Sequence, residues 1–458
     1  MSHLASWLAE NGHSVSGEDV PEDFYTSALL KNIPVFEPGS ALPDGTDAVV
    51  YSTSYEKRAV RAKSEACQRG VRLYSYPEML ALLTRDRVAA GVSGTHGKST
   101  TAAISSFLIK SSGIAASSIY GSFLKNDSSA VVCGDKGLVI EACEYQDHFL
   151  LYDLDILLIT NISWDHPDWF ENAAAVRASF RQRVITMKQN SVVICHDSLK
   201  RYAADWASER PDIFFITYGP RSSFSLSHSI ADDSYSVSGC SVSFRPEEKN
   251  LSIIYDYLGA LILTSALSLL IEGRSARYEE SVRRKMDELG PLLSSFPGLA
   301  ARCDAVADEN GVLYIDDYAH HPEEIRVCLD NIGRKYPSRR LVVLFMPHTA
   351  SRTEAFMKDF VSALSRCDAL FIQPVYASAR QDGAESDAAW RLYKAVDRRV
   401  FRTFYGRLAS VSYVRSNEDA ACQLASFLQS NDILLSLGAG DNRALLQRIA
   451  GLRADKGF

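Results

Sequence analysis

The stretch Ser93-Gly94-Thr95-His96-Gly97-Lys98-Ser99-Thr100-Thr101 does more than any other to decide the fold of this chain. An apolar run at residues 88–92 precedes it, and a helical pattern over residues 102–110 follows it. Strand, glycine turn and helix start, in that order, are typical of a phosphate-binding loop, in which backbone N–H groups and the positive helix N-terminus meet phosphate oxygens. The match to G-x-x-x-x-G-K-[ST] is incomplete, because Val92 replaces the first glycine. The alternative is a glycine turn followed by an ordinary helix cap.

The loop offers two side chains suited to nucleotide chemistry. Lys98 supplies a positive charge for the β- and γ-phosphates, and we expect it to be a solvated loop residue aimed at phosphate. The Ser99 hydroxyl is a hard oxygen ligand for Mg²⁺. The loop residues predicted to bind a nucleotide are Gly94, Thr95, His96, Gly97, Lys98, Ser99 and Thr100.

Length and charge limit the classes of protein open to this chain. At roughly 150 residues per domain, a length of 458 residues predicts about three domains. The hydrophobic fraction of 46% suits globular cores. A net charge of −7 and a pI of about 5.9 give no basic surface for nucleic acid, so we expect no nucleic-acid partner.

Cysteine usage and hydropathy favour a cytoplasmic protein. The nine cysteines include no C-x-x-C pair and are odd in number, which favours reduced thiols over a disulfide framework. The longest apolar stretch, residues 257–271, is interrupted by Thr264, Ser265 and Ser268 and predicts a buried helix rather than a membrane span. The start of the chain shows no basic region of a cleavable signal.

The first 88 residues predict alternating helices and strands, and therefore a parallel sheet. A helix is expected over residues 2–11, with Leu4, Trp7 and Leu8 on one face. Strands are expected over residues 13–17, 48–52 and 71–75. A dinucleotide-type domain has a strand and a glycine-rich turn before its first helix, and neither precedes this helix. We therefore expect the functional product to begin upstream of Met1, and this domain to bind its nucleotide ligand weakly as it stands.

The rest of the chain continues the α/β pattern. Near-continuous apolar runs predict strands buried on both faces, at residues 138–142, 155–161, 191–195, 213–217, 312–315, 340–345, 369–372 and 432–437. Period-two alternation in residues 221–244 predicts a small antiparallel excursion around Gly239. The glycine- and proline-containing stretch 290–298 is the best candidate for a domain boundary.

Two polar clusters follow strands of the central region, where the ligand crevice of an open α/β sheet lies. Glu141 ends an apolar strand and is placed either as a Mg²⁺ ligand or as a solvated carboxylate. Residues 160–168 contain an asparagine, two aspartates and His166, which precedes a proline and is expected to be extended. The alternative for His166 is a turn cap, because Mg²⁺ prefers oxygen ligands.

Three further clusters follow strands nearer the C-terminus. The sequence Asp316-Asp317-Tyr318-Ala319-His320-His321-Pro322 suggests a metal site or contacts to a nucleotide ribose, with a helix start at Asp317 as the alternative. His348 and Arg352 are four residues apart and would share one face of a helix, where arginine suits bidentate contact with a carboxylate or phosphate. Residues 438–442 form a glycine-containing turn.

The order and spacing of these clusters resemble the Mur ligases, ATP-dependent amide-bond enzymes of peptidoglycan synthesis. The most specific parts of the resemblance are residues 94–100, 161–168, 316–322 and 347–353, and it covers nearly the whole chain. It implies an α/β fold of three domains: a Rossmann-like UDP-substrate domain at 1–88 that lacks its first strand, a central P-loop ATPase domain at 89–297, and a Rossmann-like C-terminal ligase domain at 298–458. The family's phosphate loop also lacks the first glycine.

The resemblance implies roles for residues of the phosphate loop and of the strands beside it. Lys98 would hold the γ-phosphate of ATP, and Ser99 would bind a first Mg²⁺. Glu141 and His166 would serve a second Mg²⁺. Together with ATP and Mg²⁺, these residues would form the catalytic centre.

The resemblance also assigns residues to the nucleotide and to the substrates. Arg302 and Asp317 would contact ADP. Ser52, His348 and Arg352 would face the substrates. The implied reaction adds L-alanine to UDP-N-acetylmuramate through an acyl phosphate, in the cytoplasm and without membrane insertion, and no oligomeric state is implied.

Some positions depart from the pattern of the family. Its Arg-Arg-Phe-Glu stretch appears here as Ala301-Arg302-Cys303-Asp304, so one arginine is absent. Residues 256–262 contain no His-Asn-x-x-Asn motif, and the family's His-Arg-x-Ser-Arg appears as residues 348–352 with threonine in place of its arginine. The glycine-rich turn that would bind UDP diphosphate is also absent.

Three alternatives remain open at this point. A muropeptide-recycling ligase couples a tripeptide to the same nucleotide, and Ala319 favours it, whereas His348 and Arg352 favour the alanine reaction. A folylpolyglutamate synthetase type gives no reason for a UDP domain. A nucleotide-binding regulator without ligase activity is disfavoured by intact Lys98, Glu141 and His166, whereas the incomplete N-terminal domain favours it.

Overall fold

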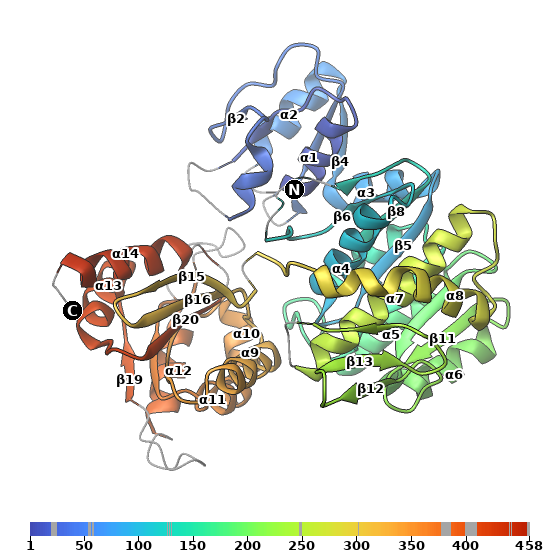
Figure 1. Cartoon of the computed structure of the whole chain (residues 1–458). Coiled ribbons are helices and arrows are strands. Elements are labelled where there is room, and N and C mark those ends of the chain that lie inside the picture. The colour runs from blue at the N-terminus through green and yellow to red at the C-terminus, as the bar shows by residue number, and fades with distance from the viewer. Residues whose placement is uncertain are drawn as a thin grey trace. The chain divides into compact units, whose positions relative to one another are not determined.

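The computed structural model describes the chain except at residues 20–24, 54–55, 57–58, 126, 128, 130, 247–249, 301, 377–385, 399–409, 439, 441 and 456–458. Three residues of the sequence patterns above, Ala301, Ala439 and Asp441, therefore lie outside the described residues. The chain divides into two compact units: the first contains nearly all residues up to Leu299, and the second contains the residues from Ala300 onward together with the short segment Asp23–Tyr25. Figure 1 shows that sheets and packed helices make up both units.

The core of the first unit is a seven-stranded sheet that brings distant parts of the sequence side by side (Figure 1). The strand order is β11 (Phe214–Tyr218), β10 (Val192–His196), β9 (Ile156–Ile159), β5 (Val88–Ser93), β8 (Gly137–Glu141), β6 (Ala116–Ile119) and β7 (Val131–Val132). Neighbours are parallel except β6 and β7. The carboxyl end of the central strand, β5, is therefore flanked by those of β8 and β9.

Helices cover both faces of this sheet, which explains the near-continuous apolar runs of its strands. Ala90 and Val92 face one core, which contains side chains of α4 (Lys98–Ser112), α7 (Leu251–Ile271) and α8 (Glu279–Leu289). Ala89 faces the opposite core, which contains side chains of α3 (Tyr76–Arg85), α5 (Ala173–Ile185) and α6 (Lys200–Glu209). The central parallel sheet predicted from the sequence is confirmed.

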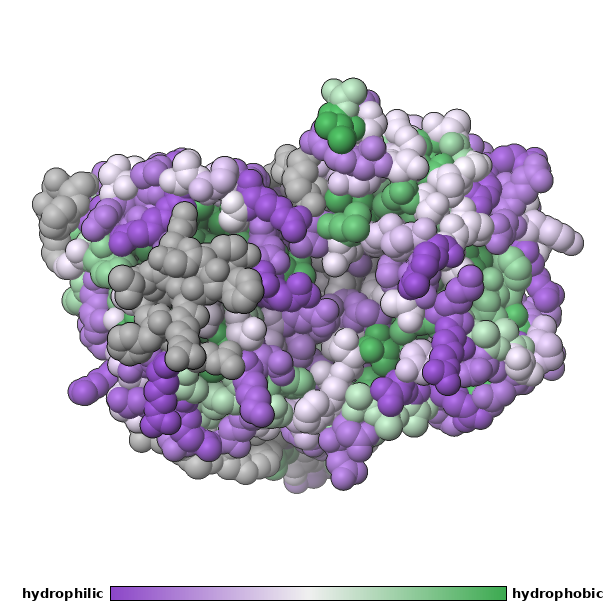
Figure 2. Space-filling view, turned by 90° about the horizontal axis from the view of Figure 1, so that it is seen from below, coloured by the Kyte–Doolittle hydropathy of each residue, from purple (hydrophilic) through white to green (hydrophobic). Residues whose placement is uncertain are grey.

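Apolar side chains lie on all sides of helix α7, and the core of the first unit surrounds the helix. Among the described residues it is the one helix long and apolar enough to cross a membrane, but 83% of its apolar window is buried inside the fold. The buried helix predicted over residues 257–271 is therefore confirmed. On the face of the molecule drawn in Figure 2, hydrophilic residues predominate and apolar residues lie in separate patches.

The serine-rich region after β11 forms a small antiparallel sheet, as predicted. Its strands are β12 (Leu226–Ser229), β13 (Ser234–Val237) and β14 (Ser243–Phe244). Tyr235, Val237 and Phe244 are buried, which accounts for the alternation of the sequence. Gly239 has a φ of +68° in the turn between the last two strands.

The N-terminal part of the first unit contains α1 (Ser2–Glu10), α2 (Val60–Arg69) and two separate pairs of parallel strands. One pair is β1 (Gly17–Glu18) with β2 (Val35–Phe36), and the other is β3 (Ala48–Tyr51) with β4 (Arg72–Ser75). In the described part of the chain, no strand joins the two pairs. The strand predicted over residues 13–17 is wrong, because residues 13–16 are mostly exposed and pairing starts only at Gly17.

The second unit is built on a six-stranded sheet. Its order is β15 (Asp304–Glu309), β16 (Val312–Asp317), β20 (Asp432–Gly438), β17 (Arg340–Met346), β18 (Ala369–Ile372) and β19 (Ser410–Tyr413). Only the pair β15 and β16 is antiparallel. Its helices are α9 (Pro322–Lys335), α10 (Ala350–Ala355), α11 (Met357–Leu364), α12 (Ala388–Asp397), α13 (Asn417–Phe427) and α14 (Asn442–Asp455). The predicted polar clusters after β16, β17 and β20 therefore share one edge of this sheet.

Candidate active site

The turn between β5 and α4 has the geometry of a phosphate-binding loop. Gly94 and Gly97 have φ angles of +129° and +82°, in the region that favours glycine. An added Cβ would lie 2.1 Å from Thr160 Oγ1 at Gly94, and 2.6 Å from Asp256 Oδ1 at Gly97. Since α4 begins directly after Gly97, its free backbone N–H groups face the loop, which is the arrangement that binds phosphate.

The segment after β9 holds this loop in place. Thr95 N–H donates to the Asn161 carbonyl at 3.2 Å, and His96 N–H donates to Asn161 Oδ1 at 3.1 Å. In return, Asn161 Nδ2 donates to the His96 carbonyl at 3.0 Å. Thr95 Oγ1 donates to the Ser163 carbonyl at 3.0 Å and accepts from Ser163 N–H at 2.8 Å. The loop backbone is therefore pre-organised by residues that follow the neighbouring strand.

Lys98 is the first residue of α4, and its side chain is buried, so the expectation of a solvated loop lysine is wrong. Its Nζ donates to the Gly94 carbonyl at 2.5 Å and to the Thr95 carbonyl at 3.1 Å. Nζ also lies 3.1 Å from Glu144 Oε2, in an ion pair whose side chains are 12% and 2% exposed. Burial lowers the pKa of Lys98 and is the largest single effect, but the acidic groups around it, Glu144 foremost and then Cys143 and Glu141, together raise the pKa above its ordinary value. Lys98 therefore stays cationic.

Ser99 and Glu141 meet at the same end of the sheet. Ser99 Oγ lies 3.1 Å from each carboxylate oxygen of Glu141, to which it donates. Gly121 N–H donates to Glu141 Oε2 at 2.9 Å and fixes the carboxylate. The contact arises because β5 and β8 are parallel neighbours, with Val92 opposite Glu141. A hydroxyl beside a carboxylate is a pair of hard oxygen donors that fits Mg²⁺.

His166 lies against Tyr145, which follows Glu144 in the sequence. The two rings have centroids 4.6 Å apart, and His166 Nε2 is 3.7 Å from Asp165 Oδ2. Its φ of +53° shows that the predicted extended backbone is wrong. The turn itself outweighs the pre-proline preference, because His166 N–H donates to Asp165 Oδ1 at 2.7 Å and its carbonyl accepts from the N–H groups of Trp169 and Phe170.

Two acidic residues belong to this site although the sequence analysis gave them no role. Glu144 is the buried partner of Lys98. Asp256, on α7, places its carboxylate against Gly97. The signal for Glu144 was its position in the polar cluster that follows β8, whereas no local pattern connects Asp256 with the loop.

In the second unit, Asp317 is buried and its carboxylate is already engaged. Oδ1 accepts from Ala319 N–H at 2.7 Å, and Oδ2 accepts from Cys303 N–H at 2.7 Å. Asp317 ends β16 and α9 starts only at Pro322, so Asp317 does not start a helix. The guanidinium of Arg302 lies 5.6 Å from the centre of the Tyr318 ring, close in sequence to Asp317.

His348 and Arg352 meet, although not on a shared helix face. Helix α10 begins at Ala350, with Thr349 as its N-cap, so His348 precedes the helix and the predicted helical spacing is wrong. Arg352 Nη1 donates to His348 Nδ1 at 3.2 Å, and Arg352 is only 4% exposed. The His348 ring also contacts His320, with centroids 5.1 Å apart. The edge of the second sheet thus gathers a buried cation and two imidazoles.

Ser52, the remaining predicted substrate residue, follows β3 in the N-terminal part of the first unit. Its side chain is half-buried. The structure therefore places Ser52 at the carboxyl end of a parallel strand, the end at which ligands bind in such sheets.

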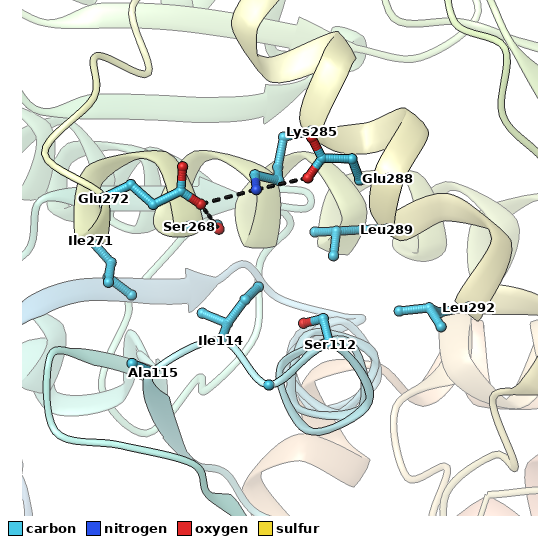
Figure 3. Close-up of a pocket in the computed structure, with 11 residues that line it drawn as sticks. Ser112, Ile114, Ala115, Ser268, Ile271, Glu272, Lys285, Glu288, Leu289 and Leu292 are labelled. Carbon is cyan, nitrogen blue, oxygen red and sulfur yellow. Dashed lines mark hydrogen bonds and ion pairs between the residues drawn. The ribbon is translucent and has the colours of Figure 1, made fainter.

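A pocket in the first unit lies away from the phosphate loop. Figure 3 shows Lys285 between Glu272 and Glu288, with distances of 2.9 Å and 2.8 Å from its Nζ to their carboxylates. The pocket also contacts Ser112, the last residue of α4, about 21 Å along the helix from Lys98. Since its charges pair with one another at the far end of the helix, this pocket is separate from the phosphate loop.

A parallel sheet with a phosphate loop at the end of its central strand defines a nucleotide-binding α/β protein of the P-loop class. Models of three domains match this chain: "Mur ligase family, catalytic domain" over residues 1–88, "Mur ligase middle domain" over residues 92–267 and "Mur ligase, glutamate ligase domain" over residues 301–440. The chain belongs to the Mur ligase family, and it is an ATP-dependent ligase of that family.

Known proteins resemble the chain over almost its full length. The UDP-N-acetylmuramate–L-alanine ligase of Borrelia garinii subsp. bavariensis is 30% identical over 454 residues, which cover 96% of this chain and 94% of that protein. The structure of a UDP-N-acetylmuramate–alanine ligase from Thermotoga maritima matches with a TM-score of 0.69 at 21% identity, over 100% of this chain and 97% of that one. A murein peptide ligase from Psychrobacter arcticus matches with a TM-score of 0.68 at 18% identity, over 99% and 96%. At 21% and 18% sequence identity, these two matches show that the folds are similar.

Proposed function

We propose that this chain uses ATP to add L-alanine to UDP-N-acetylmuramate in peptidoglycan synthesis. The observation that carries the proposal is the phosphate loop, in which Lys98 and Ser99 stand beside Glu144 and Glu141. The similarity to an alanine ligase over 96% of the chain supports the choice of substrates. The reaction belongs to the cytoplasm, where ATP and the nucleotide precursor are available.

The proposed chemistry has two steps. The γ-phosphoryl group of ATP passes to the lactyl carboxylate of the muramic acid and gives an acyl phosphate. The amine of L-alanine then attacks the acyl carbon, phosphate leaves and the amide bond forms. Transfers of this kind depend on positioning and charge neutralisation more than on covalent participation of the protein.

Residues of the first unit are suited to the first step. The N-terminus of α4 and the Lys98 ammonium would hold the phosphates, and Gly94 and Gly97 would let the backbone approach them. Glu144 is a positioning residue, because it holds Lys98 beside the loop. Ser99 and Glu141 would hold Mg²⁺, which supplies charge neutralisation when bound, and His166 would complete a second metal site.

Residues of the second unit are assigned to substrates and nucleotide. The buried Arg352, oriented by His348, would pair with a carboxylate of L-alanine or of the muramoyl group. Arg302 and Asp317 would contact ADP, although Asp317 must share its carboxylate with the N–H groups it already accepts. Ser52 would contact the UDP-linked substrate.

Competition between acceptors tests the choice of substrate. The full chain is given ATP, Mg²⁺, UDP-N-acetylmuramate and equal concentrations of L-alanine, glycine, L-serine and a muropeptide tripeptide, and the products are separated by mass. The alanine adduct should dominate. A dominant tripeptide adduct would assign the chain to muropeptide recycling, and absence of every adduct with retained ATP binding would make it a nucleotide-binding regulator.

A further inference from the structure

Three potential ligand atoms converge within the second unit, and two of them are thiols to which the proposed reaction gives no role. Cys303 precedes β15, Asp317 ends β16 and Cys328 lies on α9. The Sγ atoms and a carboxylate oxygen of these residues all lie within 4.8 Å of one another. Because the three residues belong to separate elements of one unit, the fold itself brings them together, and no short sequence motif announces the cluster.

We propose that Cys303, Asp317 and Cys328 bind a thiophilic divalent cation of the Zn²⁺ class. Zn–S bonds of about 2.3 Å and Zn–O bonds of about 2.1 Å at tetrahedral angles separate two sulfurs by about 3.8 Å, and a sulfur from an oxygen by about 3.6 Å. In the structure the two Sγ atoms are 3.7 Å apart, and Cys303 Sγ lies 3.3 Å from Asp317 Oδ2. Two thiolates and one carboxylate would leave the fourth position for water.

The observed sulfur separation fits a shared cation better than a covalent bond. A disulfide has an S–S length of about 2.05 Å, so Cys303 and Cys328 would have to approach each other by about 1.6 Å. A tetrahedral ion requires almost no change in their separation. The Asp317 carboxylate can serve as a third ligand of a cation, whereas a disulfide would not involve it.

The surroundings of the cluster support a binding site. Ala319 N–H donates to Asp317 Oδ1 at 2.7 Å and so orients the carboxylate, as partners of metal ligands commonly do. Asp317 and Cys328 are each 5% exposed, whereas Cys303 is half-buried and gives a path from solvent. Soft thiolates would select Zn²⁺ over Mg²⁺, which prefers oxygen.

The functional consequence rests on the proposed ligase activity. If Asp317 contacts ADP as the family resemblance implies, a cation on its carboxylate competes with that contact. Zn²⁺ would then raise the KM for ATP without removing Lys98 or Ser99 from the phosphate loop. Cation binding itself does not depend on this assignment.

Binding is tested with the metal alone, on the full chain kept reduced by a non-thiol reductant. Zn²⁺ is titrated in competition with a chromophoric chelator, and Co²⁺ replaces Zn²⁺ in a parallel experiment so that thiolate-to-metal charge-transfer absorption reports the ligands. One Zn²⁺ per chain should bind at this site, with thiolate bands in the Co²⁺ form. Cys303→Ser and Cys328→Ser should each weaken binding at least about tenfold and remove most of the thiolate absorption.

Cys367→Ser is the matched control, because Cys367 is also a buried thiol of the second unit but donates to the Leu364 carbonyl instead. It should bind Zn²⁺ like the parent. Zn²⁺ should also raise the melting temperature of the parent and of Cys367→Ser, and not that of Cys303→Ser. Equal Zn²⁺ affinity in the parent and the Cys303→Ser variant, or a Co²⁺ spectrum without thiolate bands, would overturn the site. A Cys303–Cys328 disulfide found under reducing conditions would do the same.

The ATP dependence is measured separately. A bound Zn²⁺ with an unchanged KM for ATP would leave the site standing and contradict only its proposed effect on the nucleotide. Loss of ligase activity in every preparation would contradict the proposed function and leave the binding result intact.

Discussion

Lys98 and Glu144 form a buried ion pair whose two members have separable effects on activity and stability. We predict that Lys98→Ala lowers ligase turnover at least about 10²-fold, the scale of removing one preorganised charge from a transition state. It should also destabilise the chain by roughly 3–5 kcal/mol, because Glu144 is left as a buried charge without its cation. Turnover and urea unfolding measure the two effects.

The double variant Lys98→Ala with Glu144→Gln separates catalysis from folding. It removes both charges, so most of the lost stability should return while turnover stays low. Near-normal turnover in Lys98→Ala would contradict the phosphate-loop mechanism. Equal stability of the single and double variants would contradict the importance of the buried pair.

Glu141 and His166 are the residues whose metal roles most need a test. Glu141→Ala and His166→Ala should each raise the Mg²⁺ concentration for half-maximal activity by about 10–100-fold, because each would remove a group that we propose binds or orients the ion. Lys188→Ala, which breaks a partly exposed ion pair with Asp155 elsewhere in the first unit, is the control. Overlaying Mg²⁺ titrations for His166→Ala and the parent would make His166 a cap of its turn.

Arg352 is buried beside His348, and its charge suits a carboxylate of a substrate. Arg352→Ala should raise the KM for L-alanine or for UDP-N-acetylmuramate ten- to hundredfold, which corresponds to roughly 1.5–3 kcal/mol for a charge-assisted contact. The KM for ATP should change less. Arg366→Ala, at an exposed arginine paired with Asp330, is the matched control. A selective effect on ATP would place Arg352 at the nucleotide.

At the scale of elements, helix α1 is held to the first unit by a buried histidine. His3 Nδ1 lies 2.9 Å from the Tyr120 carbonyl, and Leu4 and Trp7 enter the core beside it. Burial lowers the pKa of His3 from its usual 6.5 to about 4. Between pH 6.5 and 4 the unfolded chain therefore binds a proton that the folded chain excludes.

This difference predicts how stability depends on pH. The contribution of neutral His3 is fully present above pH 6.5 and decreases as the pH falls towards 4, by up to roughly 3 kcal/mol. His3→Gln removes this titration, so its unfolding free energy should depend less on pH over the same range. Parallel pH profiles for the variant and the parent would contradict the assignment.

Elements with a strong periodic signal could be predicted, and weakly specified ones could not. The phosphate loop, the buried helix α7 and the sheet of β12, β13 and β14 follow from glycine positions and apolar period. The strand predicted over residues 13–17 failed, because it contains a single apolar side chain, the half-buried Val15, and pairing with the short strand β2 begins only at Gly17. The backbone conformation of His166 was predicted incorrectly, because hydrogen bonds within its own turn outweigh the preference for extended backbone before a proline.

At the scale of the whole molecule, the site depends on contacts between residues far apart in sequence. The sequence predicted that polar clusters would gather at strand ends, and β5, β8 and β9 do bring Ser99, Glu141 and Asn161 together. It could not show that Lys98 is buried against Glu144, since that depends on how α4 packs beside β8. The contacts of Asp256 with Gly97 and of Cys303 with Cys328 could not be predicted either, because each joins residues from separate elements.

Transfer of isotope from the muramoyl carboxylate to inorganic phosphate tests the proposed acyl-phosphate reaction. UDP-N-acetylmuramate labelled with oxygen-18 in its lactyl carboxylate is incubated with the chain, ATP, Mg²⁺ and L-alanine, and the products are analysed by mass spectrometry. We expect an alanine adduct and inorganic phosphate that carries one labelled oxygen, because the acyl phosphate passes that oxygen to phosphate. Phosphate release without label, or without the alanine adduct, would contradict the proposed reaction.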